Sequence, residues 1–502
     1  MSATISMKKA QRRARKRKQR KDLRKQQVSK GLKQVSRPTL PNRNCPWKTP
    51  EEEQTARQVM VEGVLKVFRA LLPGLLADLA KIPDPRNPRK TKHQLTVLLL
   101  YGLLAFVFHY SSRREAGREM SRPVFYETLK QLFPELESLP HQDTLCRLLE
   151  RIEVEEIETA HINLLRRLIR NKKFVHYLVK KRYLIAIDGT QKFTSEECWG
   201  EEYLQRHTKG QGEEPQYYVY LLEAKLVFPN GLVLPLMSEF LNNTLDEVTN
   251  KQDCELKAFG RLAERLHRHF PKLPITVLLD GLYANGPVIA LCRKYRWEFM
   301  IVLQDDALPL VWREANGLHK LQPEQEHTQT WNGRCQRFWW ANDIIYEYGP
   351  NGCRKQRIHV VVCEETWEEL GEQDEIISKT SRHAWISSEP LSKQNVHTRC
   401  NLMARQRWGI ENDILQEKHQ GYHYEHVFSH DWNAMKGYHY LMHLAHLLNE
   451  LAQNSIELAE HVQEVGIRGF VRLLRETLSG PWLEKEQIQR IVGQRHQLRL
   501  IA

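Results

Sequence analysis

Apolar residues between residues 46 and 169 recur with the spacing of helices, so this part of the chain is predicted to be helical. The expected helices are Glu51–Leu79, Leu95–Phe108, Pro123–Phe133 and Leu145–Ile157. Asp143 or Thr144 is the expected N-cap of the last helix. Such a module either reads DNA through a helix-turn-helix or is ordinary helical packing, and the pattern does not separate the two.

From residue 183 onward the pattern changes to that of strands. The expected strands are Tyr183–Ile187, Tyr217–Phe228, Leu232–Phe240, Ile275–Leu279 and Phe299–Leu303. Pro229-Asn230-Gly231 is a hairpin signal, so the first three strands should be antiparallel. Helical spacing at Leu256–Phe270 and Pro287–Tyr295 separates the later strands, and the second of these helices predicts a parallel β-α-β unit. The fold class is therefore α/β with a mixed sheet.

Two of these strands are followed by the same pair of residues. Asp188-Gly189 comes after the first strand and Asp280-Gly281 after the fourth. In α/β sheets the carboxyl ends of strands are where ligands bind. We therefore expect the two aspartates to lie close together although they are far apart in sequence.

A third acidic position lies in a predicted helix near residue 411. Arg407, Glu411 and Lys418 are four and seven residues apart, which places them on one helix face. A carboxylate between two cations suits a site that holds a metal ion and a phosphate together. The alternative is an ion-pair network on a solvated helix, and this stretch alone does not decide between them.

The charge of the chain is concentrated at its amino-terminal end. The formal net charge is +14, and residues 1–45 contain 16 Lys and Arg against the single acid Asp22. A run with so many basic and so few apolar residues cannot bury a core and is expected to be disordered. Its natural partner is a phosphate backbone, while a solubilising tail and a membrane-surface patch are the alternatives.

A second basic segment, Arg166–Arg182, has eight Lys and Arg and no acid, and it leads into the first strand. The candidate DNA-binding residues in it are Arg166, Arg167, Lys180, Lys181 and Arg182. The nine cysteines are scattered without paired spacing, and the longest apolar run, Leu95–Phe108, is shorter than the roughly 20 residues that cross a bilayer. The cysteines and the short apolar run indicate a cytoplasmic protein with reduced thiols and no membrane partner. Binding to DNA would make it nucleoid-associated.

The order of Asp188, Asp280 and Glu411 resembles the catalytic core of insertion-sequence DDE transposases, which have a ribonuclease H-like fold. Arg407, Glu411 and Lys418 match the arginine, glutamate and lysine of a signature found in a large group of them. The signature's tyrosine would fall on Ala404, which is the one departure. Residues 331–363 alternate like strands around a Gly-Pro-Asn-Gly turn, as the β-rich insertion of the family does.

The resemblance implies a bacterial or archaeal-type transposase that cleaves phosphodiester bonds at the ends of its element and joins the 3′ ends to target DNA. Asp188, Asp280 and Glu411 would bind two Mg²⁺ ions per active site, with Mn²⁺ able to substitute. Arg407 and Lys418 would hold DNA phosphates. Because two element ends must be brought together, a homo-oligomer is expected. The rival functions are a transposase-derived DNA-binding protein that no longer cuts and a metal-dependent nuclease of the same fold.

The predicted organisation has six parts. They are a basic tail (1–45), a helical DNA-binding region (46–180), the first part of the core (181–310), a β-rich insertion (311–380), the last part of the core (381–454) and a helical extension (455–502). Two other groups carry competing interpretations. Asp305 and Asp306 are interpreted as a polar strand exit, and the helically spaced His439, His443 and His446 as packing or DNA contact in preference to zinc.

Overall fold

The structure, a computed structural model, describes residues 12, 14–22, 25, 45–206, 215–243, 252–370 and 376–501. The chain forms two compact units. We call Leu40–Ile275 with Gln406–Ala502 the larger unit, and Met1–Thr39 with Thr276–Arg405 the smaller unit. Most of the predicted basic tail lies outside the described residues.

The helical region of the larger unit is mostly as predicted. Its helices are α2 (Pro50–Leu79), α3 (Leu95–Val107), α4 (Arg113–Met120), α5 (Pro123–Leu132), α6 (Gln142–Leu149) and α7 (Glu155–Arg170). The predicted single helix Leu145–Ile157 is wrong, because α6 begins earlier with His141 as its N-cap and ends at Leu149. The next helix, α7, begins with an acidic first turn, in which the carboxylates are stabilised by the positive end of the helix dipole. The predicted linker Arg166–Arg182 therefore begins inside α7.

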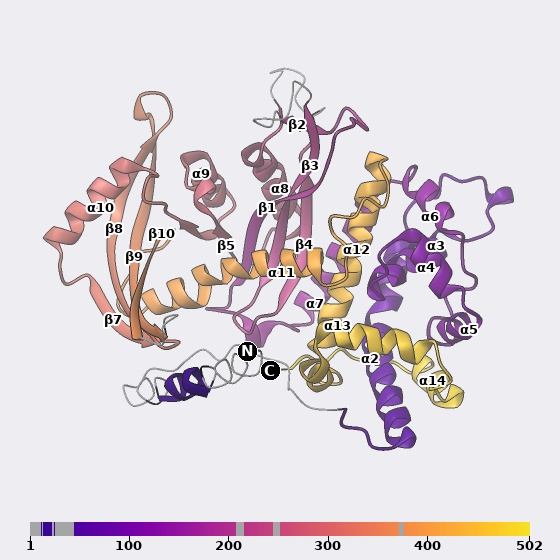
Figure 1. The fold of residues 1–502 in the computed structure, drawn as a ribbon. Coiled ribbons are helices and arrows are strands. Elements are labelled where there is room, and N and C mark those ends of the chain that lie inside the picture. The colour runs from indigo at the N-terminus through magenta and orange to yellow at the C-terminus, as the bar shows by residue number, and fades with distance from the viewer. Residues whose placement is uncertain are drawn as a thin grey trace, which may run out of the picture. The chain divides into compact units, whose positions relative to one another are not determined.

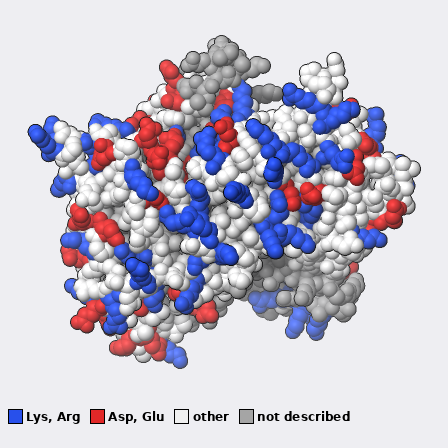
Figure 2. Space-filling model, turned by 180° about the vertical axis from the view of Figure 1, so that it is seen from behind, with Lys and Arg blue, Asp and Glu red and all other residues white. Residues whose placement is uncertain are grey.

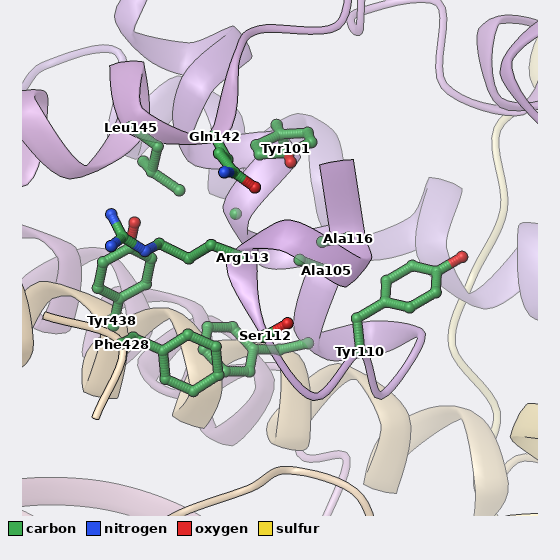
Figure 3. Close-up of a pocket in the computed structure, with 12 residues that line it drawn as sticks. Tyr101, Ala105, Tyr110, Ser112, Arg113, Ala116, Gln142, Leu145, Phe428 and Tyr438 are labelled. Carbon is green, nitrogen blue, oxygen red and sulfur yellow. The ribbon is translucent and has the colours of Figure 1, made fainter. Parts of the chain in front are cut away.

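The apolar helix α3 packs beside α12 (Trp432–Gln453), which comes from the far end of the sequence (Figure 1). Close approach requires Gly102, since a Cβ there would lie 2.6 Å from Cδ2 of Leu145 and 2.9 Å from Cδ1 of Leu441. Nearby, a cavity of about 20 Å³ lies among α3, α4, α6 and α12, with Arg113 extending across it toward Tyr438 (Figure 3). This volume fits about one water molecule, so the cavity is a packing feature and no ligand site.

The strands of the larger unit form the predicted antiparallel meander. They are β1 (Tyr183–Ser195), β2 (Leu204–Arg206), β3 (Gln216–Val227) and β4 (Val233–Phe240). β3 pairs with β1, β2 and β4, always antiparallel. The hairpin between β3 and β4 turns at Gly231, whose φ of 91° favours glycine. One expectation is wrong: Asp188 does not end β1, which continues to Ser195 because the backbone pairing with β3 persists after the apolar run stops.

Helices cover both faces of this meander. α8 (Glu255–His269) lies on one face, where the hydroxyl of Tyr220 on β3 donates to Oε1 of Glu255 at 2.6 Å. α11 (Trp408–His419) and α12 lie on the other face, where they contact Lys225 and Glu223 of the same strand. Gly189 is required on the α8 side, because a Cβ there would lie 2.5 Å from the Tyr220 oxygen. Asp188 therefore faces the α11 side.

The smaller unit contains a second set of strands. Its elements are β5 (Ile275–Leu279), α9 (Gly286–Lys294), β6 (Glu298–Val302), α10 (Pro309–Leu321), β7 (Glu326–Trp331), β8 (Arg334–Tyr348), β9 (Arg354–Leu370) and β10 (Ile376–Ser387). β5 and β6 are parallel, as the β-α-β pattern predicts. β10 pairs with β6, and the order continues through β9 and β8 to β7 with antiparallel pairings. The segment predicted to be a β-rich insertion thus begins with a helix, and its strands extend the β5–β6 sheet.

The segment predicted to be a helical extension contains α13 (Ala459–Leu478) and α14 (Lys485–Val492). All nine cysteines are free thiols. Among the described helices, none combines the length and apolar character needed to cross a bilayer. The predicted fold class, α/β with parallel and antiparallel strands behind a helical amino-terminal region, is confirmed.

Candidate active site

Asp188 lies in the middle of β1, at the point where the burial of the strand changes. The residues from Tyr183 to Ile187 are buried, whereas the Asp188 side chain is 20% exposed. One of its carboxylate oxygens accepts the backbone N–H of Gly189 at 2.9 Å. The strand therefore presents this carboxylate at the edge of the core, where a polar ligand can reach it.

Glu411 on α11 meets Asp188 through Arg407. Nη1 of Arg407 lies 2.8 Å from Oε1 of Glu411 and 3.7 Å from Oδ2 of Asp188. The guanidinium also lies 4.7 Å from the ring of Trp408 and is largely buried. The larger unit thus brings two of the three predicted acids around one cation, although they are far apart in sequence.

Lys418 lies on the same face of α11, as the helical spacing predicts. Its Nζ donates to the backbone oxygen of Gln191 on β1 at 3.3 Å and lies 2.9 Å from Oε1 of Glu425. The ammonium is therefore held between β1 and the loop after α11. Asp188, Glu411, Arg407 and Lys418 form a strip of alternating charge within the larger unit, and we call these four residues the acid–base strip.

Asp280 belongs to the smaller unit. It directly follows β5, as predicted, and caps a short 3-10 helix, Gly281–Tyr283, by accepting the backbone N–H of Leu282 at 3.0 Å. The Asp-Gly pattern has a local reason, because a Cβ at Gly281 would lie 2.6 Å from Cδ of Gln304. The backbone thus fixes the direction of this carboxylate at a strand end.

The other predicted DNA-binding residues differ in their availability. Arg166 is exposed on α7, and Lys180 and Lys181 are exposed in a tight turn, with φ of 51° and 60°. Arg167 instead forms an ion pair with Asp78, and Arg182 donates to the backbone oxygen of Ile275 at 2.6 Å. Figure 2 also shows many Lys and Arg side chains at the surface. Three of the five residues are therefore free of these structural contacts with the core.

Two family descriptions match the chain. The one described as "Transposase DDE domain" matches residues 241–448, which contain Asp280 and Glu411, and the one described as "DDE_Tnp_1-associated" matches residues 76–165 in the helical region. The chain belongs to the DDE transposase family. It is accordingly a DNA transposase, an enzyme that cleaves DNA and transfers strands, and DNA is its partner.

The comparison with solved structures gives a match of low sequence identity. Among solved structures, a piggyBac transposase synaptic complex with hairpin DNA is similar over 84% of this chain and 80% of that chain, with 10% sequence identity and a TM-score of 0.36. No curated protein matches the sequence.

Membership of the family implies a divalent metal cofactor, and the donor set of the transposase fits one. The side chains of Asp188 and Glu411 offer carboxylate oxygens, which hard divalent ions prefer. Both carboxylates are partly exposed. Both also lie near the same positive charge, the guanidinium of Arg407. In the smaller unit, the Asp280 carboxylate is partly exposed as well.

A buried group of charged residues behind the acid–base strip was not predicted from the sequence. Lys225 on β3 lies with its Nζ 2.6 Å from Oδ2 of Asp413 and 2.6 Å from Oε2 of Glu417, both on α11. Nδ1 of His446 on α12 is 2.6 Å from the other oxygen of Glu417. All four side chains are buried. We call Lys225, Asp413, Glu417 and His446 the α11 anchor.

Within the α11 anchor, neighbouring charges outweigh the effect of burial on the pKa of Lys225, Glu417 and His446, whereas burial raises the pKa of Asp413. Burial alone would lower the pKa of Lys225, but Asp413 and Glu417 raise it above its usual value. Burial alone would raise the pKa of Glu417, but Lys225, His443 and His446 hold it well below its usual range. The pKa of His446 is raised to about 10 by the two carboxylates, against the effect of burial. The anchor therefore contains two cations and at least one firmly ionised carboxylate.

The histidine spacing seen in the sequence reflects packing. His439, His443 and His446 are all buried on α12, so they are not available for direct contact with DNA. Among the described residues, two groups have the spacing of metal ligands: Glu223 with His439 and His443, and Asp413 with Glu417 and His446. In the second group the Lys225 ammonium already takes the place of a cation between the carboxylates. In the first, burial and neighbouring charges lower the pKa of His439, and Nζ of Lys192 lies 3.5 Å from its Nδ1.

Proposed function

We propose that this transposase cleaves phosphodiester bonds at the ends of its insertion sequence and joins the 3′ ends to target DNA. The observation that carries the proposal is the meeting of Asp188 and Glu411 on Arg407, in a family whose chemistry uses carboxylates. Asp280 is proposed as the third acid, on the basis of its position after β5 and within the matched domain.

The cofactor in this proposal is a pair of Mg²⁺ ions per active site, for which Mn²⁺ can substitute. Bound divalent ions would supply a deprotonated water or 3′-hydroxyl and neutralise the leaving oxygen. Asp188, Asp280 and Glu411 would hold them through carboxylate oxygens. The chain's own acids therefore set where the attacking oxygen is deprotonated.

Arg407 and Lys418 are proposed to bind DNA phosphates beside the acids. Arg407 uses part of its planar fork on Glu411 and Asp188, and a guanidinium has five N–H donors, so others remain for a phosphate oxygen. Lys418 contributes a point charge from the same helix face. Arg166, Lys180 and Lys181, which are exposed, are proposed to contact the backbone farther from the cut, and Arg167 and Arg182 to support that surface from its base.

The assembly follows from the reaction. Two element ends must be joined to one target, so we propose a homo-oligomer when the ends are synapsed, acting on chromosomal DNA in the cytoplasm. The two rival functions are a DNA-binding derivative that no longer cuts and a nuclease that only hydrolyses. Three acidic side chains at the expected positions favour a cutting enzyme over the first rival, and strand transfer separates the transposase from the second.

The test measures cleavage, strand joining and binding of a duplex that carries the element end. Asp188→Asn, Asp280→Asn and Glu411→Gln should each lower cleavage and joining in Mg²⁺ by more than about 100-fold while the mobility shift with DNA persists. Asp305→Asn is the matched control, because Asp305 is an exposed acid after the neighbouring strand β6 and pairs with Arg382. If Glu411→Gln cleaves DNA at the wild-type rate, Glu411 does not belong to the active site. Cleavage without joining by the wild type would favour the nuclease.

A further inference from the structure

The helix that carries Glu411 has two functional edges. With 3.6 residues per turn, Arg407 and Lys418 lie within about 40° of Glu411 around the helix axis, whereas Asp413 and Glu417 lie about 200° and about 240° away. The contacts agree with this geometry: Glu411 faces Arg407, while Asp413 and Glu417 face Lys225 inside the core. One edge of α11 thus carries the acid–base strip and the opposite edge is bound by the anchor.

Lys225 also belongs to the strand that pairs with the strand of Asp188. In the register of β1 and β3, Lys225 lies opposite Ala186, and Glu223, two residues earlier, lies opposite Asp188. The Lys225 side chain therefore connects the backbone that positions Asp188 to the helix that positions Glu411. A shift of α11 along or around its axis would break two hydrogen bonds of 2.6 Å at once.

Stability alone does not explain a charged anchor at this place. Apolar residues of similar volume in a buried interface are often as stabilising as an ion pair, because burying charges carries a large desolvation cost. What charge-assisted hydrogen bonds add is directional restraint, since they weaken when the angle or distance changes. An apolar contact would allow α11 to shift along β3. Two carboxylates bound to one ammonium fix both the rotation of α11 about its axis and its distance from β3.

We propose that Lys225, through Asp413 and Glu417, is a positioning residue that sets the separation of the Asp188 and Glu411 carboxylates for the metal ions. The inference rests on the proposed function, because it concerns how the same site is held in shape. It assigns no contact with DNA or metal to Lys225, which is fully buried.

The test compares three variants in the full-length chain. Glu417→Gln keeps the size of the side chain and the Lys225–Asp413 pair, so it is the mild variant and is expected to fold. Lys225→Met/Asp413→Asn/Glu417→Gln removes three of the buried charges together and takes both carboxylates away from His446, whose proton can then leave, so that no unpaired ion is forced to stay in the core. Arg261→Met is the matched control, because it breaks ion pairs of α8 with Glu239 and Asp253 on the other side of the sheet.

The first readout is independent of activity. Mn²⁺ should raise the melting temperature of the wild type once its free concentration exceeds the dissociation constant, and we call the concentration at this onset, which reports metal affinity, the Mn²⁺ midpoint. We expect the midpoint to move to about 10-fold higher Mn²⁺ in Glu417→Gln and further in the triple variant, as is typical when the support of a metal ligand is lost. Arg261→Met should lower the melting temperature without moving the Mn²⁺ midpoint. The second readout is the Mg²⁺ dependence of cleavage, which should move in the same order.

The outcomes separate the two proposals. If Glu417→Gln keeps the wild-type Mn²⁺ midpoint and the wild-type Mg²⁺ dependence of cleavage, the positioning role is wrong. A midpoint that moves equally in Arg261→Met would also overturn it, because general destabilisation would then be the cause. Glu411→Gln is the reference for the site itself. If that variant binds Mn²⁺ and cleaves like the wild type, the proposed function is wrong, and this result does not depend on the role of the anchor.

Discussion

The raised pKa of His446 predicts a loss of stability on the alkaline side of neutrality. His446 is fully buried, with Nδ1 2.6 Å from Glu417 and Nε2 3.3 Å from Asp413. Its pKa is raised from 6.5 to about 10, so the folded chain binds this proton more tightly than the unfolded chain does. The resulting stabilisation is complete below pH 6.5 and is lost as the pH rises through about 10.

The size of the effect follows from linkage. One proton held only by the folded state gives a slope of about −1.4 kcal/mol per pH unit, which amounts to a loss of roughly 1.6 kcal/mol between about pH 6.5 and about pH 8. Lys192 acts in the opposite sense above that window. Burial lowers its pKa to about 8, so the unfolded chain binds the extra proton between about 8 and 10.5, and stability rises with pH there. The two slopes should nearly cancel above pH 8.

The assay is urea unfolding followed by circular dichroism at several pH values between about 6.5 and about 8. His446→Gln removes the titrating group and keeps a hydrogen-bonding side chain of similar reach. The difference in free energy of unfolding between wild type and variant should shrink by roughly 1.6 kcal/mol across this window, because the titrating groups that do not interact with His446 contribute equally to both proteins. A difference that stays constant with pH would refute the assignment of the proton to His446.

Three further predictions concern other parts of the chain. Arg265→Met should destabilise the protein by about 3–5 kcal/mol, because it leaves the buried carboxylate of Glu158 without its cation. Arg268→Met breaks only an exposed pair with Glu264 and should change stability by less than about 0.5 kcal/mol. Thermal melting measures both changes. Gly102→Ala should cost about 1–3 kcal/mol through overpacking against two leucines, while Gly260→Ala, in open space on α8, should not destabilise. Deleting residues 1–45 should flatten the salt dependence of non-specific DNA binding, and an unchanged slope would exclude the tail from that binding.

Local patterns in the sequence were sufficient for much of the fold. The apolar run of α3, the hairpin at Gly231 and the strand β5 with Asp280 at its end all lie where the pattern predicts them. Each depends on residues close in sequence. The spacing of Arg407, Glu411 and Lys418 likewise predicted a shared helix face, which the contacts show.

Long-range pairing decided what the sequence did not reveal. β1 continues past Asp188 only because β3 pairs with it, so the end of the apolar run was a poor guide to the end of the strand. Lys225 and Glu223 looked like ordinary charged residues until α11 and α12 covered them. One signal was available: two opposite charges, two residues apart in the otherwise apolar strand β3, lie on one face and need a buried partner.

The segment from α10 to β9 leaves the β5–β6 sheet and returns to it at the same place. The chain departs after β6 and comes back as β10, which pairs directly with β6, and the backbone N–H of Leu303 donates to the oxygen of Ala384 at 2.9 Å. Entry and exit are thus neighbours, so everything from α10 to β9 behaves as an excursion whose two ends already meet. Its length can change by whole hairpins at little cost in loop closure. Asp280 lies before this segment, at the end of β5. Its backbone support would therefore stay the same whatever the length of the segment.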